Sequence, residues 1–352
     1  MRVITLMREL GAEFEHSVLA LDGNFEAARA LGPQALAPLP APAHKNTVLA
    51  VPELVAILRK QRPDLLLTYN WGAVDAVMAG LLARICPVIH TEDGFGPDEA
   101  RRRKRRRVWA RAVLLRRIYK TVLVSKELLR IAAAEYGLPP EKTQLILNGI
   151  DTEKFQPRRN PELRSRMGIP DGALVFGTVG RLRAEKNLEL MLRAFAGMAM
   201  AGARLVVVGD GDCRRRWQAL AESLGPGGQV LFTGATEDPA PYYGIFDVFL
   251  MSSITEQMPL ALLEAMSCGL PAVCTAVGDT ADMLGVREGP ELAPSGDPRA
   301  YQEALRAMAS NTRLRQELGA KNRRRSQGYS MSAMVSAYAG LYGAAVRAGG
   351  VR

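Results

Sequence analysis

Two cations stand at the ends of a short loop in the second half of the chain. The string G-R-L-R-A-E-K-N, residues 180–187, follows an apolar run typical of a strand, and a helix is expected from about Asn187. Arg181 and Lys186 would then project from the carboxyl end of a strand, where they could stabilise the charge that grows on a departing diphosphate. A surface loop closed by salt bridges would have the same spacing, so the string alone leaves both interpretations open.

A second group combines two carboxylates with the start of a helix. In T-E-Q-M-P-L-A-L-L-E-A-M, Glu256 lies just ahead of a predicted helix, Pro259 lies in its first turn and Glu264 lies on it. Because helical side chains lean toward the N-terminus, Glu264 would reach back toward Glu256. The backbone amides around Met258, Pro259 and Leu260 would make an anion seat. An amphipathic core helix, the alternative, does not explain the spacing of Glu256 and Pro259.

Together these segments resemble glycosyltransferase family 4, whose members are retaining enzymes of the GT-B fold. The resemblance covers roughly residues 10–350. Its marks occur in order along the chain: Asn148-Gly149-Ile150-Asp151 with Phe155, the G-R-L-x-x-E-K-N string, Val208-Gly209-Asp210-Gly211, and two glutamates with seven residues between them. Any one mark is weak, but the ordered set is specific.

The resemblance implies a role for each residue of the donor site. Arg181 and Lys186, beside Gly180, would bind the donor diphosphate. Glu264 would bind the ribose, and Glu256 would hold the sugar near its anomeric carbon. A nucleoside diphosphate sugar is then the donor substrate, and neither a cofactor nor a metal is expected. The D-x-D string at residues 210–212, a metal motif in another glycosyltransferase fold, is predicted to be a turn here.

Two departures from the family pattern fall within this site. Gln257 and Met258 replace the small residue that often follows the first glutamate, which would alter the sugar pocket. Gly278 and Asp279 stand where the family often has two glycines.

The first half contributes candidates of its own. His90 is predicted at the carboxyl end of a strand, beside glycines, where residues of parallel sheets usually face a ligand cleft. In related enzymes a histidine in this loop hydrogen-bonds the donor sugar or assists the reaction, and some relatives carry it at the place of Asp93. The catalytic candidates are therefore His90, Asp93 and Glu256, with a structural histidine as the alternative for His90.

A strongly basic segment follows these candidates. Between Asp98 and Lys120 there are eleven Arg or Lys against two acids, and Arg103, Arg107 and Arg111 recur at helical spacing within Arg101–Arg111. Such a stripe beside apolar residues suits an anionic membrane surface. Nucleic-acid binding is disfavoured because Trp109 is the lone aromatic in the run, and a solvated face remains an alternative.

Apolar runs alternate with helical stretches along the whole chain, which predicts two doubly wound α/β domains with the active-site cleft between them. We expect a Rossmann-like acceptor domain at 1–157, with a helix at about 331–352 packing back on it, and a donor domain at 158–330. The expected strands are 15–21, 64–69, 87–91, 120–124, 143–147, 174–180, 204–208, 229–233, 247–251 and 271–275.

The start of the chain departs from this plan. Residues 1–10 have helical spacing, so the strand and Gly-rich loop that usually open the family's first domain have no counterpart. Neighbouring strands would then have an unpaired edge, which invites dimerisation through the first domain.

Bulk properties limit the remaining function classes. The chain has 352 residues, a net charge of +10 and no apolar run long enough to span a membrane. Four cysteines without C-x-x-C spacing favour reduced thiols in a cytoplasmic protein, either free or peripheral on the inner face of the plasma membrane. We expect a retaining transferase that moves a sugar from a nucleoside diphosphate to a hydroxyl of a glycan or lipid-linked acceptor. A nucleotide-sugar epimerase or hydrolase, or a non-catalytic polyanion-binding protein, is the alternative.

Overall fold

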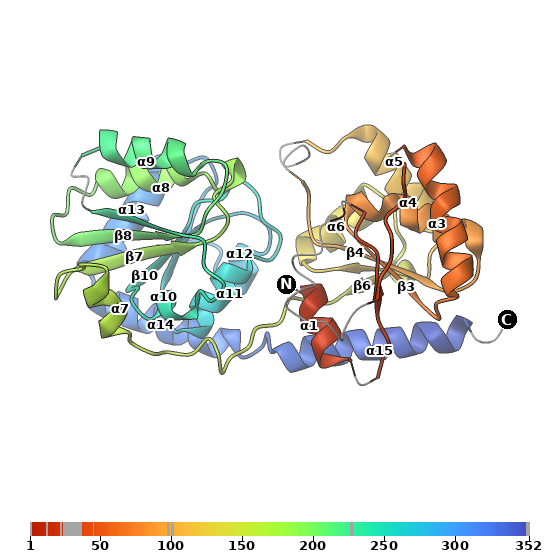
Figure 1. Ribbon diagram of the computed structural model, residues 1–352. Coiled ribbons are helices and arrows are strands. Elements are labelled where there is room, and N and C mark those ends of the chain that lie inside the picture. Colours follow the sequence, from red (N-terminus) through yellow and green to blue (C-terminus); the bar gives the residue numbers. More distant parts are fainter. Residues whose placement is uncertain are drawn as a thin grey trace. The chain divides into compact units, whose positions relative to one another are not determined.

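The computed structural model describes residues 2–11, 13–21, 23, 37–44, 46–96, 99, 102–225 and 229–349. The chain divides into two compact units, one comprising Met1–Gly149 and Ser332–Arg352 and the other Ile150–Met331 (Figure 1). The first unit therefore contains both ends of the chain, and the second is a continuous stretch between them. We expected the division at residues 157–158, and the contacts place it at Gly149–Ile150.

The second unit contains a six-stranded parallel sheet in the order β12-β11-β10-β7-β8-β9. The strands are β7 Leu174–Val179, β8 Ala203–Val208, β9 Val230–Gly234, β10 Val248–Met251, β11 Ala272–Thr275 and β12 Leu292–Ala293. This confirms the five strands expected in this half. The sixth, β12, has only two residues, which is too short for an apolar pattern to reveal.

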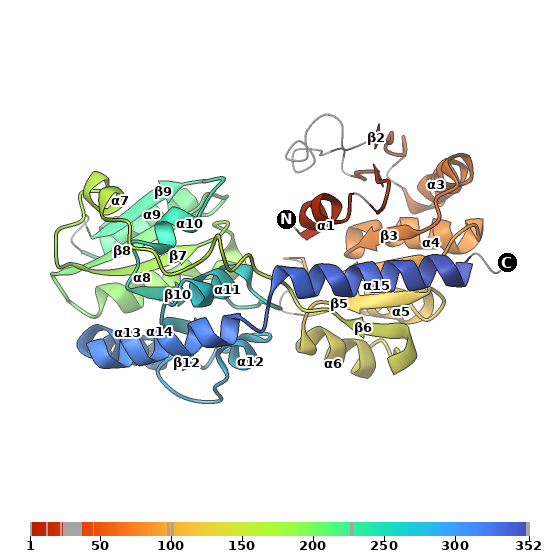
Figure 2. The same cartoon turned by 90° about the horizontal axis from the view of Figure 1, so that it is seen from below.

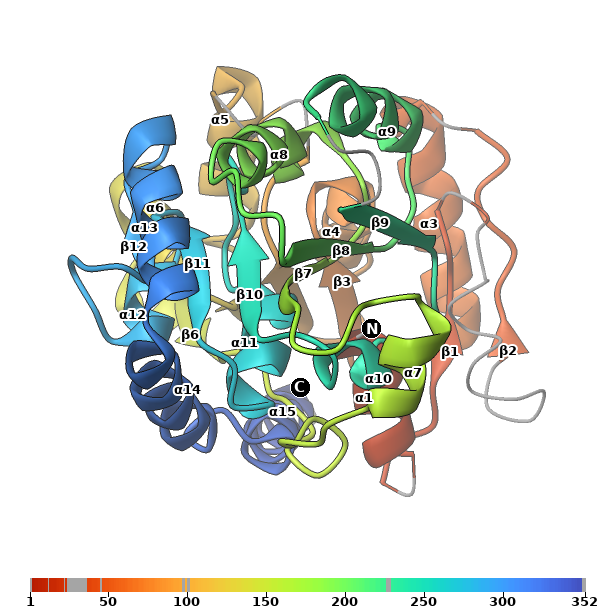
Figure 3. The same ribbon diagram turned by 90° about the vertical axis from the view of Figure 1, so that its left-hand side faces the viewer.

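Helices cover both faces of that sheet (Figure 3). They are α7 Pro161–Arg166, α8 Leu188–Ala196, α9 Arg214–Ser223, α10 Ala240–Tyr243, α11 Leu260–Ser267, α12 Thr280–Leu284, α13 Pro298–Ser310 and α14 Thr312–Ser326. Residues of α8, α9 and α13, among them Phe195, Trp217 and Leu305, form one buried core with the sheet. On the other face α11 packs on α14, so the doubly wound prediction is confirmed for this unit.

The first unit contains a four-stranded parallel sheet in the order β3-β4-β5-β6. Its strands are β3 Leu66–Tyr69, β4 Val88–Glu92, β5 Lys120–Leu123 and β6 Thr143–Leu145. Its helices are α1 Arg2–Glu9, α3 Thr47–Gln61, α4 Val74–Ala83, α5 Arg105–Leu114, α6 Lys126–Ala134 and α15 Met331–Gly349. Helices α3, α4 and α5 lie on one side of the sheet and α15 on the other (Figures 1 and 2).

The beginning of the chain is helical, as its spacing predicted, with α1 at Arg2–Glu9. The strand expected at 15–21 is wrong in extent: only β1, Ser17–Val18, forms, and it pairs with β2, Ala37–Pro38, in a separate two-stranded sheet. The amide of Leu39 donates to the carbonyl of Val18 at 2.9 Å at the end of this short ladder. Within the described residues, β3 is therefore the outer strand of the larger sheet.

The C-terminal helix α15 completes the first unit through aromatic contacts. Tyr338 and Tyr342 have ring centroids 5.7 Å apart, and Phe14 meets Tyr342 edge-on at 5.9 Å. The guanidinium of Arg2 lies 5.9 Å from the centroid of the Tyr338 ring. Residues from the two ends of the sequence thus stabilise each other. Among the described residues, no helix is both long and apolar enough to cross a membrane.

The packing of β7 gives a stability prediction. A Cβ added at Gly177 would lie 2.3 Å from the ring of Phe246, which is fully buried. We expect Gly177→Ala to lower the free energy of unfolding by about 1–3 kcal/mol, because the ring has no space to move. Gly202→Ala, with nothing within 4 Å of the added Cβ, should change it by less than about 0.5 kcal/mol. Urea unfolding of both variants measures the difference, and equal stabilities would contradict the packing described.

Candidate functional site

The two predicted donor segments meet at the carboxyl edge of the second sheet. Lys186 ends a short 3₁₀ turn, Ala184–Lys186, that follows β7, and Glu256 lies in the loop between β10 and α11. The Lys186 Nζ donates to Glu256 Oε1 at 2.5 Å, with the side chains 30% and 14% exposed. Ser253 Oγ donates to the same oxygen at 2.8 Å. Two segments separated by 70 positions thus form one charged centre.

Backbone contacts fix the two loops against each other. The amide of Ile254 donates to the carbonyl of Glu185 at 2.8 Å, and Ser252 Oγ donates to the carbonyl of Lys186 at 2.9 Å. Gly278 (φ +52°) lies beneath the second loop, where a Cβ would be 2.3 Å from the carbonyl oxygen of Glu256. The glycine is therefore required at that position by close approach as well as by backbone conformation.

The predicted diphosphate ligand Arg181 is exposed on the first of these loops. Among the described residues, no hydrogen bond or ion pair reaches its guanidinium, whereas its neighbour Arg183 lies 4.0 Å from Glu185. Gly180 precedes it with φ +157°, and its carbonyl would be 1.9 Å from a Cβ at Gly209. The loop thus passes close to the end of β8 and leaves Arg181 available to a ligand.

Glu264 is held by a residue that the sequence did not indicate. The hydroxyl of Tyr243, at the end of α10, donates to Glu264 Oε2 at 2.6 Å and approaches the carbonyl of Ala261 at 3.1 Å. Tyr243 is buried, and Phe155 packs edge-on against its ring at 5.8 Å. Burial raises the pKa of Glu264 to about 7, although the hydrogen bond from Tyr243 opposes the rise. The carboxyl group can therefore change charge near neutral pH.

The helix that carries Glu264 begins one residue later than predicted. Pro259 is the N-cap residue, with φ −68° and ψ 117°, and α11 starts at Leu260. The first amides of a helix have no acceptor within it, so those after Pro259 remain suited to an anion. Met258 is buried beside them, 5% exposed, so a ligand would meet the backbone here before that side chain.

The prediction for His90 is wrong in its location. The strand β4 continues to Glu92, so His90 is the middle residue of the strand and is fully buried. Its Nδ1 lies 2.8 Å from Thr68 Oγ1, and its Nε2 lies 3.3 Å from Glu92 Oε1. Both ring nitrogens are thus occupied inside the protein, and the residue offers no surface to a ligand in this structure.

Asp93 does lie at the carboxyl end of β4 and is partly exposed. Its carboxylate accepts hydrogen bonds from the guanidinium of Arg2 and, at 3.2 Å, from Asn70 Nδ2. Arg2 also donates to Asn148 Oδ1 at 3.1 Å. Arg2, Asn70 and Asn148 come from distant parts of the sequence, and only Asn148 had been singled out, as part of a family motif. They form a polar cluster at the carboxyl edge of the first sheet.

A buried ion-pair network joins the end of β4 to α5. Arg111, 1% exposed, donates to Glu92 Oε1 at 2.7 Å and to Glu99 Oε2 at 3.5 Å. Burial alone would raise the pKa of Glu92, but His90 and Arg111 hold it below its ordinary value. Three aromatic rings enclose the guanidinium, with centroids at 5.0, 5.7 and 5.6 Å: Trp71, Phe95 and Tyr136.

The predicted basic stripe of α5 therefore faces inward. Besides the buried Arg111, Arg107 donates to Glu99 Oε2 at 2.9 Å, and Arg103 forms an ion pair with Glu135. Arg107 and Arg111 lie on one face of α5, as the spacing predicted, whereas Arg103 precedes the helix. All three meet acids of the protein, and membrane binding stays a prediction. Arg101, the first residue of the predicted surface, lies outside the described residues.

The D-x-D string occupies the loop after β8, where Asp210 Oδ2 accepts a hydrogen bond from Arg214 at 2.7 Å. In the part of the chain that the structure describes, no group of three or more His, Cys, Asp or Glu is placed to hold a metal ion. The independence of the reaction from metal stays a prediction.

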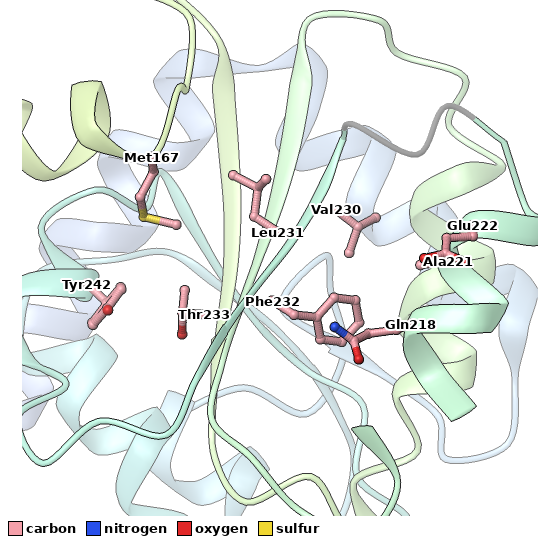
Figure 4. Close-up of a pocket in the computed structure, with 9 residues that line it drawn as sticks. All are labelled: Met167, Gln218, Ala221, Glu222, Val230, Leu231, Phe232, Thr233 and Tyr242. Atoms are coloured by element: carbon pink, nitrogen blue, oxygen red, sulfur yellow. The ribbon is translucent and has the colours of Figure 1, made fainter. Parts of the chain in front are cut away.

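A hollow of about 400 Å³ flanks the edge strand β9. Figure 4 shows Val230 and Phe232 on the side of α9, and Leu231 and Thr233 on the other side, toward Tyr242. None of the predicted site residues lines this hollow. It is a feature of the sheet edge and not of the charged centre formed by Lys186 and Glu256.

Two family models match the chain. One, described as Glycosyltransferase Family 4, matches residues 1–154, and the other, described as Glycosyl transferases group 1, matches residues 159–325. In the structural comparison, HepE of Anabaena in complex with UDP-glucose has a TM-score of 0.81 at 18% identity, over 97% of this chain and 95% of that one. That likeness shows a shared fold, GT-B, which confirms the predicted fold class.

Sequence relatives match part of the chain. D-inositol 3-phosphate glycosyltransferase 1 of Catenulispora acidiphila is 29% identical over 61% of this chain and 55% of its own length. UDP-Gal:alpha-D-GlcNAc-diphosphoundecaprenol alpha-1,3-galactosyltransferase of Escherichia coli is 29% identical over 64% of this chain and 60% of its own. The chain thus spans less than two thirds of the length of both relatives.

The contact between Tyr243 and Glu264 gives a prediction about charge. The Tyr243 hydroxyl donates to the carboxylate and so favours its ionised form. Tyr243→Phe should therefore raise the pKa of Glu264 above its value of about 7. Carboxyl-carbon NMR of the labelled side chain measures this pKa, with Glu264→Gln used to assign the resonance. An unchanged or lower pKa in Tyr243→Phe would refute the assigned direction of the hydrogen bond.

Proposed function

The chain belongs to glycosyltransferase family 4, and on that premise we propose that it is a glycosyltransferase whose donor is a nucleoside diphosphate sugar bound by the second unit. We further propose that it transfers the sugar, with retention of anomeric configuration, to a hydroxyl of a glycan or lipid-linked glycan.

The charged centre at the carboxyl edge of the second sheet carries this proposal. Lys186 and Glu256 are 2.5 Å apart, and Arg181 lies on the same loop as Lys186 without a partner among the described residues. A diphosphate brings negative charge that can recruit both cations, and the freed Glu256 can then accept hydrogen bonds from sugar hydroxyls. The centre is thus suited to exchange an internal ion pair for a charged ligand that carries a sugar.

Glu264 is suited to the nucleoside. An ionised carboxylate can accept about four hydrogen bonds through its two oxygens, so Glu264 can bind the two hydroxyls of a ribose while it also accepts the bond from Tyr243. Tyr243 fixes one of its oxygens at 2.6 Å, so the remaining oxygen keeps a defined orientation. Because its pKa is about 7, ribose binding by this residue should strengthen as the pH rises through neutrality.

The reaction that we propose needs no covalent nucleophile from the protein. The bond between the anomeric carbon and the diphosphate oxygen breaks while the acceptor oxygen bonds to the same face. The acceptor proton passes to the leaving diphosphate, whose charge Arg181 and Lys186 stabilise. We assign Asp93, held by Arg2 and Asn70, to the acceptor side as the residue that assists the reaction. His90 keeps only a structural role in this proposal, because it is buried.

The relatives support the substrate classes without fixing them. HepE of Anabaena was solved with UDP-glucose, and the name of the Escherichia coli relative includes a UDP-linked galactose donor and a diphosphoundecaprenol acceptor. Both facts favour a nucleotide-linked donor here, and the second favours a lipid-linked acceptor.

The diphosphate contacts give the first prediction of the proposed function. Arg181→Ala and Lys186→Ala should each remove a charge-assisted contact of about 1.5–3 kcal/mol and so weaken nucleoside diphosphate binding about ten- to a hundredfold. Arg183→Ala is the matched control, since Arg183 lies on the same loop but faces Glu185. Isothermal titration calorimetry measures all three affinities. Unchanged affinity in both site variants, or an equal loss in the control, would place the diphosphate elsewhere.

Product analysis tests the reaction itself. Incubation with a panel of nucleoside diphosphate sugars and lipid-linked acceptors should give one glycosylated product whose anomeric configuration, read by NMR, matches the donor. Asp93→Asn should slow product formation at least about tenfold while donor affinity stays unchanged. An inverted product, an epimerised donor, or release of free sugar at the same rate without acceptor would each overturn the proposal.

A further inference from the structure

Three arginines of the second unit line one hollow at the edge where the strands of its sheet begin. The hollow measures about 540 Å³ and is lined by Arg159, Arg164 and Arg315. Arg159 precedes α7, Arg164 lies on that helix, and Arg315 lies in the first turn of α14. Leu174, the first residue of β7, also lines the hollow. The charged centre of the donor site lies at the opposite edge, where β7 and β10 end.

One carboxylate, Asp247, lines the same hollow and already has partners. Its Oδ1 accepts a hydrogen bond from Arg159 Nη1 at 3.0 Å. Its Oδ2 accepts one from the amide of Val175 at 2.9 Å and lies 3.7 Å from Arg164 Nη1. Three guanidiniums face this one carboxylate, and no other described residue lining the hollow is ionisable, so two positive charges are in excess.

Internal hydrogen bonds orient the guanidiniums without using all of their donors. Arg315 Nη1 donates to the carbonyls of Met308 and Ala309, at 2.6 and 3.2 Å, near the end of α13. Arg164 Nη2 donates to the carbonyl of Ala173. A guanidinium has five N–H donors, and among the described residues no hydrogen bond involves the Nε of Arg164 or of Arg315. Both side chains are thus fixed at one end and retain donors for a ligand.

The excess charge and the donor type favour a phosphate group. Guanidinium groups match the oxygens of phosphate with paired hydrogen bonds. A phosphate monoester carries up to two negative charges near neutral pH, which balances the excess at this hollow, whereas a carboxylate brings one. Leu174, Met200 and Ala309 add apolar surface to the lining. The volume lies within the range of small-molecule sites, so there is room for an organic group beside the phosphate.

We propose that this hollow binds a small phosphate monoester, with the phosphate among Arg159, Arg164 and Arg315 and the organic group against Leu174 and Met200. The site is independent of the proposed transferase reaction, because it shares no residue with the donor site. An acidic peptide would instead need cations spread along an extended path, and these three line a single hollow.

Isothermal titration calorimetry on the full chain, at constant ionic strength in chloride, tests the proposal. Inorganic phosphate and glycerol 3-phosphate should both bind, and glycerol should not. The double variant Arg159→Gln, Arg315→Gln should weaken both affinities at least about tenfold, because each change removes a charge-assisted contact. The matched control is Arg158→Gln, Arg313→Gln. It removes two exposed arginines that neighbour the site in sequence but do not line the hollow, and it should keep native affinity.

A single variant guards against misfolding. Arg315 holds carbonyls of α13, so its loss could destabilise the unit, whereas the Arg159 side chain is 72% exposed. Arg159→Gln alone should therefore melt at the native temperature and still bind phosphate more weakly than the native chain.

Two further measurements locate the bound phosphate. The variant Arg181→Ala, Lys186→Ala should keep native affinity for glycerol 3-phosphate, because those residues lie at the other edge of the sheet. In NMR titrations the Nε–H signals of Arg164 and Arg315 should shift and that of Arg313 should not. Loss of binding in the donor-site variant would place the phosphate there and overturn the proposal. So would no binding at millimolar glycerol 3-phosphate, an equal loss in the matched control, or tighter binding of polyglutamate through Arg159 and Arg315.

Discussion

The ion pair between Lys186 and Glu256 is the contact on which the candidate donor site depends. It joins the loops that leave β7 and β10, two neighbouring strands of a parallel sheet. All strands of such a sheet end at the same edge, so residues far apart in sequence converge there without any dedicated connection. Each loop also packs closely against a glycine that follows a neighbouring strand: Gly278 leaves space for the carbonyl of Glu256, and Gly209 for the carbonyl of Gly180. The ion pair, the shared edge of the sheet and the two glycines therefore keep the site residues close together in the absence of a ligand.

Sequence reasoning was strongest where chemistry follows spacing along one segment. Arg181, Lys186, Glu256 and Glu264 could be singled out as candidates because a strand, a loop and a helix start carry their own local signals. Tyr243 carried none: it lies in a four-residue helix, and its importance arises only because folding brings its hydroxyl 2.6 Å from Glu264. Contacts between residues of different strands and helices depend on tertiary packing, and a local sequence pattern does not reveal them.

In the first unit, the sequence could not reveal which charged residues are buried. A period of four correctly placed Arg107 and Arg111 on one face of α5, although Arg103 precedes the helix. Periodicity does not say whether a charged face meets water or acids. Glu92 and Glu99 decide this, and their contribution is visible only when the strand and helix are packed together. The predicted location of His90 was wrong for a related reason. The strand runs two residues past it, so a residue expected beside a ligand lies within the sheet.

The division of the chain also bears on the order in which the protein can fold. Residues 150–331 form the second unit without a break, whereas the first unit needs α15, whose Tyr338 and Tyr342 pack with Arg2 and Phe14. During synthesis on the ribosome, the second unit can reach its native contacts as soon as its own residues have emerged. The first unit must wait, with part of its apolar surface uncovered, until the last helix has been translated. The earliest residues of the chain are thus among the last to be packed, and nascent chains stalled before residue 332 should be the species that chaperones retain.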